Sequence, residues 1–226
     1  MATYVLLHGA TAGSWQWRYV AVRSQTAGHE VFRPTLTGLG ERSHLLTPAI
    51  DLQTHIQDIL GVLFYEDLHN VILVGKSYSG VVITGVAERA PDLIRHLVYL
   101  DAVVPLDGQS IMDLAGETGI ALKTVVQERG DGWLIPVDRS VEPRLTEHPF
   151  KTFTQPILLN NPASEMLPRT YILCLDQPPG TMHARMTSQA VQRAKAQGWR
   201  YRELPCGPNA EQEMPQVVTE LLLELA

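Results

Sequence analysis

Residues 71–80 read Val-Ile-Leu-Val-Gly-Lys-Ser-Tyr-Ser-Gly. Four aliphatic residues predict a buried strand, and the apolar segment that follows Gly80 predicts a helix. A serine at the apex of such a strand, turn and helix adopts a sparsely populated backbone conformation between small neighbours, and its hydroxyl stands at the carboxyl end of the sheet. Ser77 is therefore the candidate nucleophile.

The stretch departs at one position from the G-x-S-x-G pattern of a nucleophile elbow. The fifth position is Ser79, and the glycine comes one residue later as Gly80. The alternative interpretation is that Ser77 only caps the following helix, as serines after buried strands often do. The strand before Ser77 and the helix after it favour the elbow.

Composition limits the classes of protein to consider. The chain has 226 residues, of which 45% are hydrophobic and 19% charged, which is typical of a globular protein with a substantial core. The net charge of -6, without a Lys/Arg-rich run, argues against nucleic acid and anionic membranes as partners. Cys174 and Cys206 are too few for a disulfide framework. Without a metal-binding spacing such as C-x-x-C or H-E-x-x-H, we expect neither a metal nor another cofactor.

The N-terminus leads directly into a short apolar run, Val5 to Leu7, without the charged region of a signal peptide. No apolar run approaches the roughly 20 residues that span a bilayer. We therefore expect a cytoplasmic protein whose partner is a small-molecule substrate. A homodimer is compatible with the sequence.

Aliphatic runs alternate with helical patterns along most of the chain. Strands are predicted at residues 4–7, 29–34, 71–74, 97–100, 170–175 and 199–204, and helices at residues 15–20, 52–65, 81–90, 181–197 and 217–226. Strands that are apolar on both faces and alternate with helices indicate a parallel sheet covered on both sides. The fold class is thus α/β, with a six-stranded, mainly parallel sheet in a single domain, residues 1–226.

Residues 106–168 break this alternation, because their aliphatic runs are short and prolines are frequent. A disordered linker is one interpretation. Trp133, Phe150 and Phe153 favour a segment that packs. We interpret residues 106–168 as a lid inserted after the strand that ends at Leu100.

Several stretches together resemble a known family. They are His-Gly-Ala at 8–10, the tryptophans at 15 and 17, the elbow at 75–80, and Tyr-Leu-Asp-Ala at 99–102 followed by Pro105. The chain resembles the α/β-hydrolase superfamily, and more closely its branch of small bacterial esterases, plant methylesterases and hydroxynitrile lyases. The resemblance implies an α/β-hydrolase fold with a pocket between sheet and lid.

The resemblance also implies a mechanism. In such enzymes a serine attacks a carbonyl, a histidine takes its proton, and a carboxylate orients the histidine. Two backbone N–H groups form an oxyanion hole for the developing charge. Here these would belong to Tyr78, after the nucleophile, and Ala10, in the loop after the first strand.

The sequence departs from the family where the base is expected. The loop after the last strand reads Gly207-Pro208-Asn209-Ala210, so that proline stands where the family has histidine, and no histidine follows His183. His183 itself is expected in a helix and not obviously in the pocket. The family places the carboxylate that orients the histidine shortly after the strand predicted at residues 170–175. Asp176 is the nearest candidate to that position, and Asp101 is the alternative. With no histidine to orient, either carboxylate can instead be interpreted as structural, Asp101 more readily than Asp176.

Four further residues are candidates for substrate contact or proton transfer. Lys76 adjoins Ser77, where it could aid catalysis electrostatically, although a solvated lysine is the preferred interpretation. From the lid, Trp133 and His148 could face the pocket, although a lone lid histidine is more often at the surface. Glu211 could supply a perturbed carboxylate if its loop turns inward, and otherwise it is a solvated charge.

Three functions fit these residues. The first is an ester or lactone hydrolase that acts on a small, largely apolar carbonyl compound with a rewired base. The second is a non-hydrolytic cyclase, lyase or isomerase, in which Ser77 and the oxyanion hole polarise a carbonyl while another group moves the proton. The third is a ligand-binding protein, because a fold does not fix a function.

Overall fold

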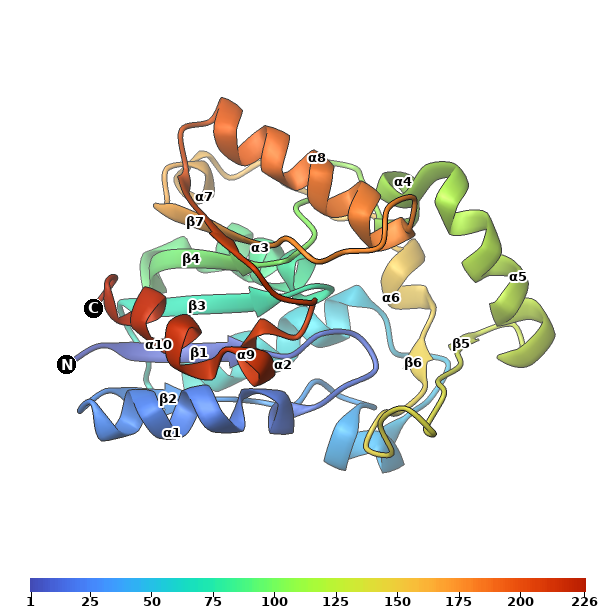
Figure 1. The fold of residues 1–226 in the computed structure, drawn as a ribbon, viewed down its shortest axis with the longest axis horizontal. Coiled ribbons are helices and arrows are strands. Elements are labelled where there is room, and N and C mark those ends of the chain that lie inside the picture. The colour runs from blue at the N-terminus through green and yellow to red at the C-terminus, as the bar shows by residue number, and fades with distance from the viewer.

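A six-stranded parallel sheet forms the centre of the computed structural model, which describes all 226 residues (Figure 1). The strands lie in the order β2-β1-β3-β4-β7-β8. Their bounds are β1 (Thr3–Leu7), β2 (Glu30–Phe32), β3 (Val71–Lys76), β4 (Ile94–Leu100), β7 (Arg169–Cys174) and β8 (Arg200–Leu204). Every neighbouring pair is parallel, which confirms the predicted sheet.

Helices cover both faces of this sheet. One face carries α2 (Leu52–Tyr65), α3 (Ser79–Arg89) and α8 (Met182–Ala196), and the other carries α1 (Arg18–Thr26) and α10 (Pro215–Leu223). The short helix α9 (Ala210–Glu213) precedes α10. The helix predicted at 52–65 has those bounds, and that predicted at 15–20 begins as the 3-10 turn η1 (Ser14–Trp17) and continues as α1.

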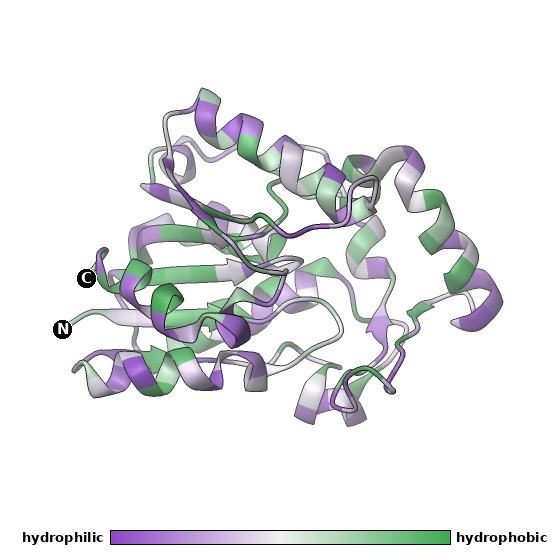
Figure 2. Cartoon of the chain, viewed as in Figure 1, coloured by the Kyte–Doolittle hydropathy of each residue, from purple (hydrophilic) through white to green (hydrophobic).

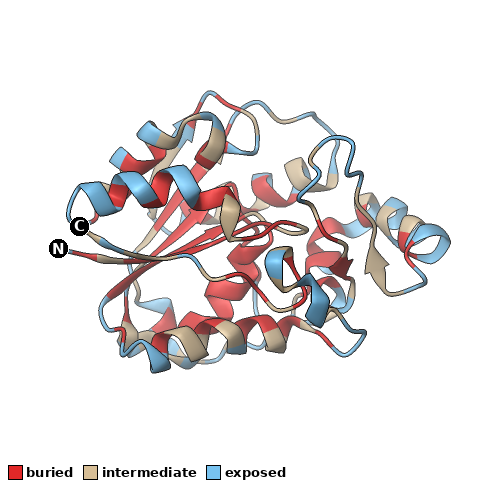
Figure 3. Cartoon of the chain, turned by 90° about the horizontal axis from the view of Figure 1, so that it is seen from below, coloured by how far each residue is buried: buried red, intermediate tan, exposed pale blue.

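The side chains of the strands alternate between two hydrophobic cores, one on each face. Leu73 of β3 packs on the α3 side, whereas Ile72 and Val74 pack on the α10 side. The central strands are therefore hydrophobic throughout, and the outer helices alternate between hydrophobic and hydrophilic residues (Figure 2). Burying each such aliphatic side chain contributes about 1.5–3 kcal/mol. Figure 3 shows the strands buried and the outward helix faces exposed.

The chain between β4 and β7 forms an ordered segment, of which residues 111–154 lie beyond the carboxyl ends of the central strands (Figure 1). Its elements are α4 (Ile111–Ala115), the 3-10 turn η4 (Gly116–Gly119), α5 (Ile120–Arg129), β5 (Leu134–Ile135), β6 (His148–Pro149), α6 (Lys151–Thr154) and α7 (Pro162–Glu165). Strands β5 and β6 pair antiparallel, and Phe153 of α6 belongs to the hydrophobic core. The alternative of a disordered linker over residues 106–168 is therefore wrong.

Two expectations about composition can be compared with the structure. Cys174 and Cys206 are both free and buried, so no disulfide is present. None of the helices combines the length and the apolar character needed to cross a membrane.

Candidate active site

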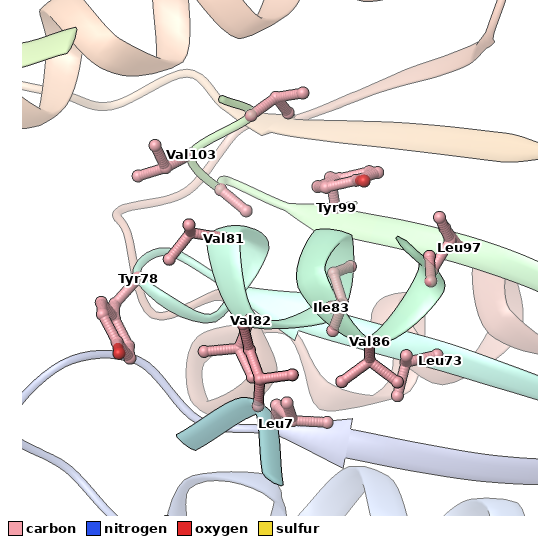
Figure 4. Close-up of a cluster of buried hydrophobic side chains, with 14 of the residues drawn as sticks. Leu7, Leu73, Tyr78, Val81, Val82, Ile83, Val86, Leu97, Tyr99 and Val103 are labelled. Atoms are coloured by element: carbon pink, nitrogen blue, oxygen red, sulfur yellow. The ribbon is translucent and has the colours of Figure 1, made fainter. Parts of the chain in front are cut away.

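The turn between β3 and α3 has the geometry of a nucleophile elbow. Ser77 has a φ of 49°, in the left-handed region that L-residues rarely occupy. A Cβ at Gly75 would lie 2.6 Å from the Ser79 carbonyl oxygen, and one at Gly80 would lie 2.0 Å from the Val103 carbonyl oxygen. Only glycine fits at these two positions, and Figure 4 shows Val103 beside the first turn of α3.

The structure also explains the serine where the pattern has glycine. The Ser79 hydroxyl donates a hydrogen bond to the carbonyl of His8, in the loop after β1. Ser77 does not cap α3, because the N-cap residue is Tyr78 and no side chain caps the helix. The capping interpretation of Ser77 is therefore wrong, and its hydroxyl is free for chemistry.

Two backbone donors lie next to the elbow. The loop after β1 approaches Ser77 so closely that a Cβ at Gly9 would lie 3.5 Å from the Ser77 Cβ. The Gly9 N–H already donates to Gln16 Oε1 at 3.1 Å. Neither the Ala10 N–H nor the Tyr78 N–H donates a hydrogen bond within the protein. Both are therefore available to a ligand.

Buried histidines support the elbow on the β1 side. The Tyr78 hydroxyl donates to His55 Nδ1 at 2.8 Å, and His55 Nε2–H donates to the Thr37 carbonyl at 3.0 Å. The Tyr78 ring stacks on Phe153, with centroids 5.4 Å apart. Burial lowers the pKa of His55 to about 4 and raises the pKa of Tyr78 above its ordinary value. Both side chains are thus neutral structural groups.

His148 ties the inserted segment to the same loop. Its Nδ1 accepts the Thr11 N–H at 3.2 Å, and its Nε2–H donates to Thr152 Oγ1 at 2.8 Å. His148 is fully buried, and burial holds its pKa well below the ordinary value. The expectation of a surface histidine is wrong, because both ring nitrogens have partners inside the protein.

His8 is held in the same way. Its Nε2 accepts the Leu36 N–H at 3.1 Å and its Nδ1–H donates to the Gly9 carbonyl at 2.8 Å. Burial lowers its pKa to about 4. Sequence alone pointed to His8 only through the family resemblance and did not point to His55. The Leu36 N–H that binds His8 and the Tyr78 hydroxyl that binds His55 come from residues distant in the chain.

Lys76 is not solvated. Its side chain is 5% exposed, and its Nζ lies 3.0 Å from Glu211 Oε1 and 2.6 Å from Asn209 Oδ1. The Glu211 side chain is fully buried, and its Oε2 has no partner. The solvated interpretations of Lys76 and Glu211 are both wrong. The ion pair fastens the loop that carries the exposed Pro208 to the elbow strand.

The two candidate acids differ sharply. Asp176 is exposed, and only its backbone is fixed, by an N–H that donates to the Cys206 carbonyl at 3.0 Å. Asp101 is 1% exposed, and its Oδ2 lies 2.6 Å from Nε2 of His183. The alternative candidate, Asp101, therefore has a histidine as its hydrogen-bond partner. The first-choice candidate, Asp176, has no histidine partner.

Asp101 is held by a second set of contacts. Its Oδ1 accepts the Cys174 N–H at 3.3 Å and a side-chain N–H of Gln177. Gln177 Nε2 also donates to the Cys174 carbonyl, and its Oε1 accepts from Thr187 Oγ1 at 3.1 Å. These bonds fix the carboxylate from both sides. The one sequence signal for this pairing was a histidine in the first turn of the helix after β7, which is the strand beside β4, and Asp101 directly follows β4.

Two surface clefts lie beside α8. One of about 930 Å³ lies between α3 and α8 and is lined by Trp199 and Arg193, and one of about 260 Å³ lies between β7 and α8 and includes Gln177. Ser77 lines neither of them. The candidate Trp133 is partly buried next to β5, where its carbonyl accepts the Phe150 N–H at 2.8 Å. The pocket between sheet and lid stays a prediction.

Comparison with known proteins identifies the family. Residues 4–221 match the model of the alpha/beta hydrolase family. The chain belongs to this family. The carbendazim hydrolyzing esterase of Nocardioides sp. (strain SG-4G) is 35% identical over an alignment of 247 residues that covers 100% of both chains. Methyl jasmonate esterase 1 of Vitis vinifera is 30% identical over 45% of this chain and 40% of its own length.

Solved structures agree with the α/β-hydrolase fold. An extracellular alpha/beta-hydrolase from a Paenibacillus species superimposes with a TM-score of 0.84 at 21% identity, covering 100% of this chain and 99% of its own. A pyrethroid hydrolase from Sphingobium faniae JZ-2 superimposes with a TM-score of 0.76 at 20% identity, covering 99% of this chain and 96% of its own. These likenesses confirm the fold.

Proposed function

We propose that the protein is a serine esterase that hydrolyses a small, largely apolar ester or lactone. The observation that carries this proposal is the strained elbow at Ser77, with the free N–H groups of Ala10 and Tyr78 beside it. Strain of this kind costs of order 1–3 kcal/mol and persists where the surrounding structure enforces it for a function. Its esterase relatives support the same reaction class.

The chemistry follows from the positions of these groups. Ser77 Oγ attacks the ester carbonyl carbon, and the negative charge moves to the carbonyl oxygen. The Ala10 and Tyr78 N–H groups donate to that oxygen, which stabilises the tetrahedral intermediate. Collapse expels the alcohol and leaves an acyl group on Ser77, which water then removes. Removing one oxyanion donor typically lowers the rate by about 10²–10³-fold.

The experiment that tests this function measures hydrolysis directly. The purified protein is assayed with p-nitrophenyl acetate, p-nitrophenyl butyrate and carbendazim, beside Ser77→Ala and, as a control, Ser79→Ala. We expect turnover of at least one ester, with a loss of about 10³-fold or more in Ser77→Ala. Ser79→Ala keeps the nucleophile and loses only the hydrogen bond to the His8 carbonyl, so it should retain much more turnover than Ser77→Ala. Equal rates for wild type and Ser77→Ala would contradict the proposal.

A non-hydrolytic reaction is the second candidate. The observation that favours it is the loop after β8, where Pro208 supplies no base and the buried Lys76–Glu211 pair occupies the neighbouring polar groups. A lyase or isomerase would use Ser77 to polarise a carbonyl without forming an ester. An acyl-enzyme trapped during ester turnover would count against this candidate. A ligand that stabilises the protein and returns unchanged would favour the third, a binding protein.

A further inference from the structure

The base expected after β8 has no counterpart in that loop. The loop's polar side chains, Asn209 and Glu211, both bind Lys76 Nζ, at 2.6 and 3.0 Å. Pro208 can neither accept nor donate a proton, and no histidine follows His183 in the chain. A histidine base for Ser77 would therefore have to come from another part of the carboxyl edge of the sheet.

Ser77 and Asp101 leave that edge side by side. Lys76 pairs with Leu100 in the parallel register of β3 and β4, so Ser77 and Asp101 are the next residues of strands about 4.8 Å apart. The Ser77 N–H donates to the Leu100 carbonyl at 3.1 Å, and the Val103 N–H donates to the Ser77 carbonyl at 3.0 Å. Both residues have the same rare φ, 49° and 48°.

Asp101 has the features of a catalytic carboxylate. It is buried, it accepts two N–H groups on one oxygen, and its other oxygen lies 2.6 Å from an imidazole nitrogen. Burying a carboxylate is costly unless its partners are fixed. A carboxylate next to a nucleophile that orients a histidine has a recognised role in acyl transfer.

His183 differs from the other histidines near the elbow. It is the second residue of α8, whose first turn is fixed by the cap from Thr181. Its Nε2 faces Asp101, whereas its Nδ1 has no hydrogen-bond partner in the protein, and its side chain is 26% exposed. With Nε2–H donating to the carboxylate, Nδ1 keeps a free lone pair that can accept a proton.

We propose that His183, oriented by Asp101, is the general base that replaces the histidine missing from the loop after β8. As Ser77 Oγ forms its bond to the substrate carbonyl carbon, the Oγ–H bond breaks and the proton passes to His183 Nδ1. The imidazolium is stabilised by Asp101 and returns the proton to the alcohol as it leaves. The same Nδ1 then takes a proton from the water that attacks the acyl-enzyme, and returns it to Ser77 Oγ as the bond between Oγ and the acyl carbon breaks and the carboxylic acid is released. This assignment rests on the proposed esterase function.

The test compares two substitutions of His183 with a matched control. His183→Gln keeps a side-chain N–H for Asp101 but has no basic nitrogen, and His183→Ala opens a space that added imidazole can fill. The control is His69→Gln, because His69 is exposed and precedes β3 at the opposite end from Ser77. For each protein, the burst of p-nitrophenol from p-nitrophenyl acetate gives the acylation rate, and the steady-state release that follows gives kcat and KM.

We expect acylation in His183→Gln to slow by about 10²–10⁴-fold with little change in KM, because a positioned base contributes that factor to the chemical step. Imidazole should restore part of the rate in His183→Ala and none in Ser77→Ala. Wild-type rates in a folded His183→Gln would overturn the role of His183 while the esterase function stood. Absence of turnover in wild type would instead overturn the esterase function.

Discussion

Histidines lie on both sides of Ser77, and the two sides differ in the hydrogen-bond partners of the ring nitrogens. On the β1 side His8, His55 and His148 are fully buried, and every ring nitrogen meets a backbone or hydroxyl group. On the β4 side His183 is partly exposed, with one nitrogen on a carboxylate and the other free. A ring with two neutral partners is fixed as neutral, whereas a ring with one carboxylate and one free nitrogen can exchange a proton.

The largest expected effect on the reaction rate comes from disrupting the contact between Asp101 and His183 on the β4 side. In Asp101→Asn, the amide N–H would donate to His183 Nε2 and move the imidazole proton to Nδ1, which could then no longer accept a proton from Ser77. By analogy with a triad whose histidine is held in the wrong tautomer, we expect kcat to fall by about 10³–10⁴-fold. Stopped-flow acylation measures the loss. An equal rate in a folded variant would place Asp101 outside the chemistry.

Lowering the pH should destabilise the protein through the buried histidines on the β1 side. The pKa values of His8 and His55 are lowered to about 4 in the folded protein, and that of His148 lies well below its ordinary value, because burial disfavours their charged forms. The unfolded chain binds protons at these residues below pH of about 6.5, whereas the folded chain does not. Their contribution to stability is therefore complete above that pH and is lost as the pH falls towards 4.

Each of these histidines should make the free energy of unfolding fall by up to about 1.4 kcal/mol per pH unit. Urea denaturation at pH 7, 6 and 5 measures the slope in a range above the ordinary pKa values of carboxyl groups. The slope should be shallower in His55→Gln, which lacks one titrating group. An unchanged unfolding free energy between pH 7 and pH 5 would show that these rings are not held neutral.

A smaller effect is expected when one buried ring is changed. His148→Gln keeps a donor for Thr152 but leaves the partly buried Thr11 N–H without its acceptor, whereas His148→Asn places an oxygen near the position of Nδ1. We expect His148→Gln to lower the free energy of unfolding by about 1–3 kcal/mol and His148→Asn to lower it less. Thermal unfolding compares the two. The reverse order would show that the bond to Thr11 is not the important one.

The elbow was predictable from sequence because it depends on local constraints. The buried strand, the short turn and the glycines at positions 75 and 80 can all be recognised from residues that are adjacent in the chain. The parallel sheet follows from the alternation of strands and helices. The departure at Ser79 could not be interpreted without the structure, since the acceptor of its hydroxyl is the His8 carbonyl, in the loop after β1.

The partner of Asp101 was not predictable for the opposite reason. His183 lies 82 residues away in the chain, and only the order of β4, β7 and α8 in space brings the two side chains together. The ion pair between Lys76 and Glu211, which are 135 residues apart, was not predicted for the same reason. Residue types indicate that a buried charge needs a partner, but they do not say which distant residue provides it.

The most direct test of the central claim is the rate and site of covalent labelling by a fluorophosphonate. A phosphonylated peptide containing Ser77 should be the principal product in wild type, identified by peptide mapping and mass spectrometry. His183→Gln should form the same product about 10²-fold or more slowly, because its serine lacks a base. An unlabelled wild-type protein, or a label on a residue other than Ser77, would contradict the account.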